Sequence, residues 1–224
     1  NPGAGKSTLL LQTVGRLCLN HKVLYVTGEE SLQQVALRAN RLKIQANNIR
    51  IAAETSIDTI CEMASKERPE VLIVDSIQVM HVTGIESAPG SVSQVREGAA
   101  ALTQFAKRTG IAVFMVGHVT KDGTLAGPKI LEHCVDCSVI LEAGTDMRYR
   151  TLRCQKNRFG AVNEIGVFAM TDTGLKEVKN PSAIFLNRQE TVAPGSLAMV
   201  TWEGTRPLLV ELQALVDLSL YSNP

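Results

Sequence analysis

The sequence predicts an α/β fold with a mostly parallel, doubly wound sheet. Three observations indicate it: short apolar runs of strand length, amphipathic segments of helix length between them, and polar residues where several runs end. The 224 residues are enough for one large domain, or for one domain and part of another. With 45% hydrophobic and 20% charged residues, the composition is that of a soluble globular protein.

Amphipathic segments predict the helices. The first expected helix begins near Lys6. Three more are expected over residues 31–42, 56–68 and 91–109. Ser31 is the expected N-cap of the second helix, because its hydroxyl can accept a hydrogen bond from the first turn. Gly110 is expected to end the last helix, since glycine readily adopts the left-handed conformation found after helix ends.

Apolar runs predict the strands. They span residues 21–27, 49–52, 71–75, 111–117, 135–142, 150–157 and 164–170. The runs 71–75 and 111–117 are continuously apolar, which is typical of parallel strands buried on both faces. The last three runs are expected to be antiparallel at one side of the sheet. The first strand of such a fold would lie before Asn1.

Charge and composition exclude several classes of protein. With 23 Lys and Arg against 22 Asp and Glu, the net charge is +1, so a nucleic-acid site would have to be a local patch. No apolar run approaches the roughly 18 residues of a membrane span, so no membrane partner is expected. The five cysteines predict reduced thiols in a cytoplasmic protein. Cys134 and Cys137 form a lone CxxC without a second pair for zinc, and are interpreted as small, partly buried side chains.

The chain opens on a motif for binding phosphate. It matches the Walker A pattern GxxxxGK[ST] except for the first Gly, and it consists of Asn1, Pro2, Gly3, Ala4, Gly5, Lys6, Ser7 and Thr8. Gly3 and Gly5 let the backbone wrap so that N–H groups face phosphate oxygens. Lys6 supplies a cation for the β- and γ-phosphates of ATP, and the Ser7 hydroxyl reaches Mg²⁺. The alternative is a simple helix cap.

Polar residues at three strand ends are candidates to complete this site. Asp75 ends the run VLIVD, where Mg²⁺ and its waters need an acceptor; the alternative is a capping Asp. Glu29 is expected to orient or deprotonate the attacking water, with Glu30 as a further contributor. The alternative for this pair is a solvated turn. His118 is expected to contact the γ-phosphate or report its loss, unless it is a surface histidine.

Taken together, the motifs resemble one family. NPGAGKST, VTGEES, VDSIQ, GHVTKDGTLAGPKILEH and KNRFG are similar in form and order to those of the bacterial RadA (Sms) family, RecA-superfamily ATPases of recombinational DNA repair. The resemblance implies a RecA-like ATPase core that uses ATP and Mg²⁺ and depends on DNA. It also implies branch migration or unwinding, a homo-hexameric ring, single-stranded or branched DNA as partner, and contact with a recombinase (RecA) filament.

The resemblance extends to the end of the chain. NPSAIFLNRQ and GSLAMVTWEGTRPLLVELQALV are similar to the family's passage into a Lon-protease-like domain. The expected division is an ATPase core over 1–175 with its first strand missing, a linker over 176–194, and the beginning of a truncated Lon-protease-like domain over 195–224. The family's N-terminal four-cysteine zinc motif is not in the sequence, which therefore looks like a fragment.

Basic residues of the later motifs are candidates for contacts with polyanions. Lys156 and Arg158 are two apart on an expected strand, so both should point to one face. The resemblance implies that they act on the ATP of a neighbouring subunit; the alternative is an exposed basic strand with Phe159 packed beneath it. Two loops, 78–94 and 120–129, are the expected DNA loops, unless they are ordinary surface loops. The candidate DNA contacts are Lys121 and Lys129 in the second loop and Arg96 just beyond the first.

Two other functions remain as alternatives. Adjacent glutamates at this position are also a feature of KaiC-type signalling ATPases, although KNRFG and the Lon-like tail argue against that reading. The tail also suggests an ATP-dependent protease component, but the sequence holds no Ser/Lys dyad that would support it.

Overall fold

The structure is a computed structural model. It describes residues 3–45, 48–118, 127–143, 148–162, 164–180, 182, 194–203 and 206–216. Of the candidate site residues, Asn1, Pro2 and Lys121 lie outside the described residues. Lys129 falls within a described helix, but its side chain is outside the described part of the structure.

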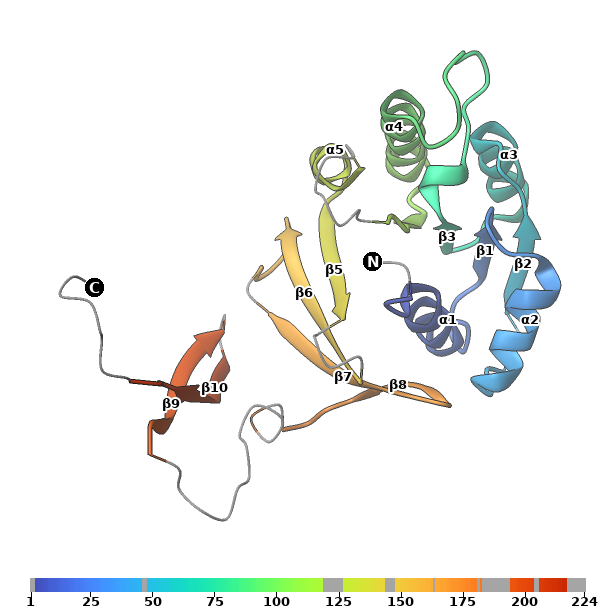
Figure 1. Cartoon of the computed structure of the whole chain (residues 1–224). Coiled ribbons are helices and arrows are strands. Elements are labelled where there is room, and N and C mark those ends of the chain that lie inside the picture. Colours follow the sequence, from blue (N-terminus) through green and yellow to red (C-terminus); the bar gives the residue numbers. More distant parts are fainter. Residues whose placement is uncertain are drawn as a thin grey trace.

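A four-stranded parallel sheet forms the centre of the fold (Figure 1). Its order is β2 (Ile49–Ala53), β1 (Val23–Thr27), β3 (Val71–Asp75) and β4 (Ala112–Met115). All three neighbouring pairs are parallel, with Thr27 beside Asp75 at the carboxyl ends of β1 and β3. The expected α/β class and parallel sheet are therefore confirmed.

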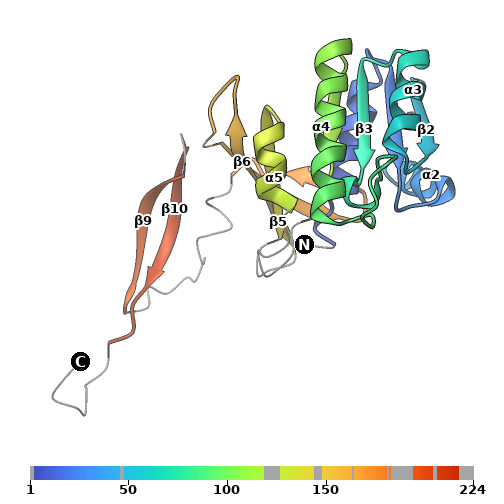
Figure 2. The same cartoon turned by 90° about the horizontal axis from the view of Figure 1, so that it is seen from above.

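Helices cover both faces of this sheet (Figures 1 and 2). The helices are α1 (Lys6–Leu17) and α2 (Leu32–Arg41) on one face, and α3 (Ile57–Glu67) and α4 (Val92–Thr109) on the other. Side chains alternate along β1, so Val23 and Tyr25 pack toward α1 and α2, while Leu24 and Val26 pack toward α3 and α4. The sheet is thus sandwiched between two apolar cores, as a doubly wound fold requires.

Side-chain caps explain where three helices begin. Ser31 accepts a hydrogen bond from the Gln34 N–H and forms a capping box with the Gln34 side chain before α2. Ser56 and Ser91 accept comparable bonds at the starts of α3 and α4. Gly110, with φ of 75°, ends α4 in the left-handed conformation. The N-cap expected at Ser31 and the helix end expected at Gly110 are confirmed.

A second, antiparallel sheet follows. Its strands are β5 (Cys137–Ala143), β6 (Tyr149–Asn157), β7 (Ile165–Thr171) and β8 (Gly174–Glu177), paired in chain order. A 3₁₀ helix η1 (Ile77–Val79) follows β3, and α5 (Gly127–Cys134) precedes β5. Strands β9 (Ser196–Glu203) and β10 (Arg206–Gln213) form a separate antiparallel pair. The boundaries proposed at residues 175 and 195 stay a prediction.

Strand β4 differs from the expectation of a fully buried strand. Its exposure alternates, and the Phe114 side chain is 42% exposed. The physical reason is the strand order: β4 is the last strand of the described parallel sheet, so only β3 pairs with it. A continuous apolar run predicts a buried strand, but it does not tell a central position from an edge.

Candidate nucleotide site

The loop before α1 has the backbone that its glycines predict. Gly3 and Gly5 have φ of 78° and 94°, in the left-handed region that glycine adopts without strain. A Cβ atom at Gly5 would lie 2.6 Å from Cε of Met170, so a larger residue would also have to displace the end of that flexible side chain. Gly5 is the N-cap of α1, and its carbonyl accepts the Leu9 N–H. The loop therefore presents a helix N-terminus at its open end, which suits a phosphate group.

The antiparallel sheet holds this loop in place. The guanidinium of Arg150, 3% exposed, donates from Nε to the carbonyl oxygen of Ala4 at 2.9 Å. The Gln12 side chain of α1 donates to the Leu175 carbonyl at 3.1 Å and accepts the Leu175 N–H at 2.8 Å. Sequence analysis missed Arg150, because 146 residues separate it from Ala4 and no local motif surrounds it.

Lys6 and Asp75 come together at the carboxyl edge of the parallel sheet. Asp75 ends β3 and is 7% exposed. Burial lowers the pKa of Lys6 below its ordinary value of 10.5, and the negative charges of Asp75 and Glu29 oppose that shift. Ser7 and Thr8 lie in the first turn of α1, beside Lys6. One carboxylate and a hydroxyl near a phosphate loop fit Mg²⁺, which prefers oxygen ligands and keeps several waters or phosphate oxygens.

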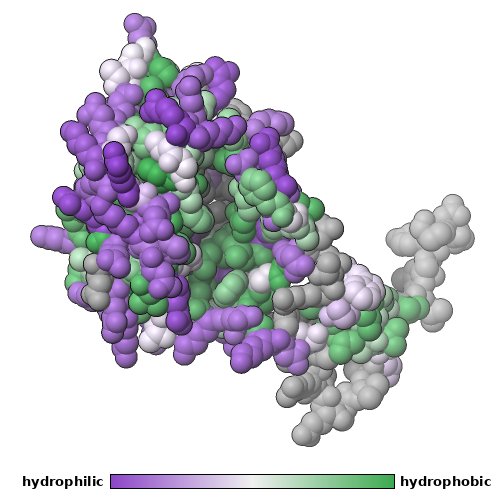
Figure 3. Space-filling model, turned by 180° about the vertical axis from the view of Figure 1, so that it is seen from behind, coloured by the Kyte–Doolittle hydropathy of each residue, from purple (hydrophilic) through white to green (hydrophobic). Residues whose placement is uncertain are grey.

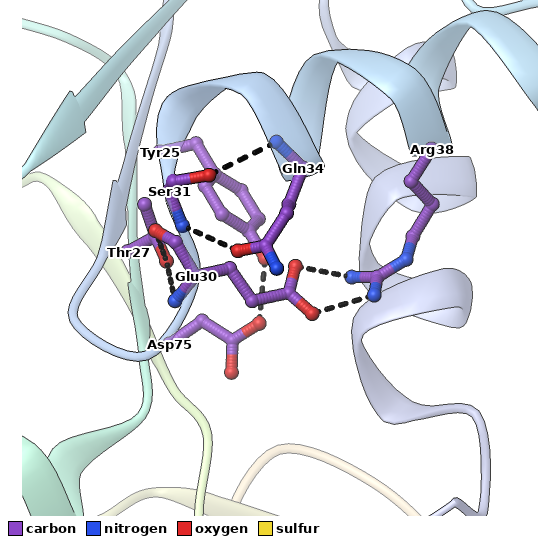
Figure 4. Close-up of polar contacts among 7 residues, drawn as sticks. All are labelled: Tyr25, Thr27, Glu30, Ser31, Gln34, Arg38 and Asp75. Atoms are coloured by element: carbon purple, nitrogen blue, oxygen red, sulfur yellow. Dashed lines mark hydrogen bonds and ion pairs between the residues drawn. The ribbon is translucent and has the colours of Figure 1, made fainter.

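The two adjacent glutamates turn in different directions. A hydrogen bond from the Glu30 N–H to the Thr27 hydroxyl at 3.0 Å shapes the turn after β1. The Glu30 carboxylate then forms two bonds with the Arg38 guanidinium, at 2.5 and 2.6 Å, on α2 (Figure 4). Glu29 instead accepts a hydrogen bond from Ser76 and lies 3.1 Å from Nε2 of His118. Of the two glutamates, Glu29 contacts another candidate residue, His118, whereas Glu30 pairs with Arg38.

Three strand ends therefore meet around Glu29. Glu29 follows β1, Ser76 follows β3, and His118 follows β4. The side chains of His118 and Glu29 are 34% and 37% exposed, so solvent reaches both. The carbonyl oxygen of His118 also accepts a bond from Gln78 at 3.2 Å, which ties the end of β4 to η1. Sequence analysis expected Glu29 and His118 at the same site, but it did not anticipate the hydrogen bond from Ser76 to Glu29.

Lys156 and Arg158 lie apart from this cluster. Lys156, on β6, donates to the carbonyl oxygen of Glu132. Arg158 pairs with Asp136 at 2.9 Å, and both side chains are about half exposed. Lys156 and Arg158 are not on one strand as expected, because β6 ends at Asn157 and Arg158 is the next residue. Phe159 is 84% exposed, so the alternative with this ring packed beneath the strand is wrong as well.

One candidate DNA residue differs in place from the expectation. Arg96 lies within α4, just beyond the first loop as expected, and pairs with Glu97 at 3.1 Å. Lys129 belongs to α5 rather than to a loop, since a helix covers Gly127–Cys134. The loop after η1 is pinned by Gln94, 3% exposed, which accepts the Val82 N–H at 2.9 Å and donates to two loop carbonyls.

Cavities lined by described residues also lie away from the phosphate loop. One of about 130 Å³, with His118 in its wall, is lined by Met115 of β4 and Val139 of β5. The other, about 770 Å³, opens at the amino ends of β3 and β4 beside His21 and Glu70, at the edge of the sheet opposite Asp75.

The surface of the molecule is mixed in polarity. The view from behind shows a hollow with apolar residues at its centre and polar residues around it (Figure 3). None of the described helices is both long and apolar enough to cross a membrane.

Comparisons with known proteins agree with this geometry. A family model described as an AAA domain matches residues 1–124. The chain is 65% identical to DNA repair protein RadA of Escherichia coli and 48% identical to that of Bacillus subtilis, along all of this chain in both cases. It spans about half the length of these relatives, covering 49% of each.

A solved structure supports the same fold. A KaiC-like protein from Pyrococcus horikoshii superposes with a TM-score of 0.65 at 16% identity, covering 80% of this chain and 86% of that one. This likeness concerns the fold alone. The matching family model, the sequence relatives and the shared fold together show that the chain belongs to the AAA domain family. It is a RecA-like member, and all 224 of its residues align with part of DNA repair protein RadA.

Proposed function

We propose that this chain is the ATPase core of a DNA repair protein, and that it hydrolyses ATP on Mg²⁺ in response to DNA. The observation that carries the proposal is the convergence of Lys6, Asp75 and Glu29 at one edge of the sheet, beside a loop with two left-handed glycines. The names of the relatives support a repair function. A cation, a carboxylate able to bind a metal and a solvent-accessible glutamate are the groups that phosphoryl transfer to water requires.

Each residue of the site has a distinct proposed task. The N–H groups of the loop and the Lys6 ammonium bind the phosphate oxygens, and Ser7 and Asp75 hold the metal. Bound Mg²⁺ neutralises charge that develops on the β- and γ-oxygens. Glu29 accepts the proton of the attacking water, and Ser76 and His118 hold its carboxylate at the strand ends. We infer that His118 exchanges its bond with Glu29 for one with the γ-phosphate when ATP is bound.

Lys156 and Arg158 are proposed to act on the ATP of a neighbouring subunit in a homo-hexameric ring. Their present partners are a carbonyl oxygen and the exposed carboxylate of Asp136. An exposed ion pair contributes only about 0–1 kcal/mol, so Arg158 is released at little cost when a phosphate approaches. A cation supplied in trans would stabilise the charge of the transition state.

The proposal extends to partners and place. We place the protein in the cytoplasm, on single-stranded or branched DNA, where hydrolysis drives branch migration or unwinding beside a recombinase (RecA) filament. Arg96, Lys121 and Lys129 are the proposed DNA contacts. These are few cations for one chain, so a ring in which six copies share the phosphate contacts suits them better than a monomer.

ATP turnover by the intact protein, titrated with single-stranded DNA, tests the function. The proposal expects Mg²⁺-dependent hydrolysis whose rate rises with DNA, and whose response to DNA weakens steeply as salt is added. A Lys6→Ala protein serves as the control for contaminating ATPases. Turnover that DNA leaves unchanged, in protein shown to bind that DNA, would contradict the DNA-dependent part of the proposal.

A further inference from the structure

Tyr25 carries a polar group into the apolar core. It lies in the middle of β1, is 1% exposed, and packs in the cluster that includes Val23, Val71 and Ile73. Phenylalanine would fill the same space, so packing alone does not account for the hydroxyl. A buried hydroxyl without a hydrogen-bond partner is unfavourable. The group that accepts a hydrogen bond from Tyr25 therefore indicates why the residue is tyrosine.

The Tyr25 hydroxyl contacts Asp75, the candidate metal ligand. The Tyr25 O–H donates to Oδ2 of Asp75 at 2.6 Å, within the short range typical of bonds to a charged acceptor. The register of β1 and β3 makes this contact possible: Thr27 pairs with Asp75, so Tyr25 lies two residues earlier on the same face. Figure 4 shows the ring reaching along the sheet with its hydroxyl directed at the Asp75 carboxylate.

The Tyr25 bond occupies only part of the Asp75 carboxylate. A carboxylate has about four lone-pair positions, and the Tyr25 bond takes one of them and fixes the plane of the group. The others remain for a metal ion or its waters.

We propose that Tyr25 is a positioning residue, whose buried hydroxyl holds the Asp75 carboxylate in the orientation that magnesium bound with ATP requires. This inference rests on the proposed function, because it gives Asp75 the metal. Residues that hold a metal ligand from behind affect metal affinity about 10–100-fold. Tyr25 thus sets how strongly the site holds the metal, without touching the nucleotide.

The variant Tyr25→Phe removes only the hydroxyl. In the intact protein, the Mg²⁺ concentration that half-saturates ATP binding should rise roughly tenfold or more. Nucleotide affinity measured in EDTA should stay within about twofold of wild type, because the loop and Lys6 do not depend on the hydroxyl. Mn²⁺ paramagnetic resonance gives a second readout, in which the variant should release the metal more readily. Tyr149→Phe, on β6, is the matched control and should leave both readouts unchanged.

A double-mutant cycle separates positioning from general damage. If Tyr25 acts through Asp75, adding Tyr25→Phe to Asp75→Asn should weaken Mn²⁺ binding little further. An unchanged Mg²⁺ requirement in Tyr25→Phe, or an equal loss of nucleotide affinity in EDTA and in Mg²⁺, overturns the inference. A wild-type protein that binds nucleotide without any response to Mg²⁺ would instead reveal a failure of the proposed function, before any variant is made.

Discussion

Nε2 of His118 lies 3.1 Å from Oε1 of Glu29, although 89 residues separate them in the sequence. The contact joins the ends of β1 and β4, which are not neighbours in the sheet because β3 lies between them. Ser76, at the end of β3, donates to the same oxygen of Glu29. Any movement of His118 toward a phosphate therefore removes one of the two hydrogen bonds that hold this carboxylate.

Removing the histidine side chain should affect hydrolysis more than binding. In His118→Ala, Ser76 still holds Glu29, so we expect ATP affinity within a few-fold of wild type and a kcat lowered about tenfold, the effect of one lost hydrogen bond to a charged group. His118→Gln, which keeps a donor of similar reach, should recover part of the rate. Steady-state kinetics with separate determination of the ATP Kd distinguishes the two effects. A loss confined to Kd would mean that His118 serves only binding.

Lys6→Ala should abolish turnover. The ammonium lies in a half-buried place near two carboxylates, and its removal leaves the transferred phosphate without a positioned cation. Such a group contributes several kcal/mol to the barrier, so we expect a loss of roughly 10²–10³-fold or more. Lys107→Ala, in the last turn of α4, is a matched control that should leave turnover unchanged. Wild-type turnover by Lys6→Ala would refute the assignment of the phosphate loop.

The trans action of Lys156 and Arg158 has a test that depends on assembly. Arg158→Ala should bind ATP nearly normally, since its own loop is intact, but should fail to hydrolyse it. Mixing the Arg158→Ala protein with Lys6→Ala should restore some turnover. Mixed rings contain interfaces with an intact phosphate loop on one side and an intact Arg158 on the other. ATPase rates across mixing ratios, with assembly confirmed by light scattering, give the answer. Rates that stay at the mutant baseline in confirmed mixed rings would leave Arg158 in another role.

The pH dependence of stability has a local contribution from Glu54. Hydrogen bonds from the N–H groups of Ser56 and Thr55 lower the pKa of Glu54 below its ordinary value of 4.5. A lowered folded pKa means that the contribution is present above about pH 4.5 and is lost as the pH falls through the folded value. The residue is only partly buried, so solvent screening keeps the effect below about 1 kcal/mol.

Thermal unfolding of wild type and Glu54→Gln across pH 7 to pH 3 measures this contribution. The wild type should be the more stable at pH 7, and the difference should vanish toward pH 3. A difference that is constant with pH would show that the charge of Glu54 is not involved. Glu62→Gln, in the middle of α3, is the control for a change of net charge.

Local signals explain what could be predicted from the sequence. The glycines of the phosphate loop, the Ser31 cap and the carboxylate at the end of β3 each depend on a few neighbouring residues, and each was found. The sequence ranked Glu29 above Glu30 but could not show their partners, because Arg38 and His118 come from different elements. Arg150 and Tyr25 were missed for the same reason: their partners, Ala4 and Asp75, are set by the order of strands in space.

The central claim is that Glu29, and not Glu30, acts on the water that attacks ATP. Single-turnover hydrolysis of pre-bound ATP by the intact protein tests it most directly, with Glu29→Gln and Glu30→Gln compared side by side. The account predicts that Glu29→Gln holds ATP with near-normal affinity and cleaves it roughly 10²-fold or more slowly. It predicts that Glu30→Gln, which disturbs only the pair with Arg38, melts at a lower temperature but cleaves ATP within a few-fold of wild type. Cleavage at the wild-type rate by Glu29→Gln, or a loss seen only in Glu30→Gln, would contradict it.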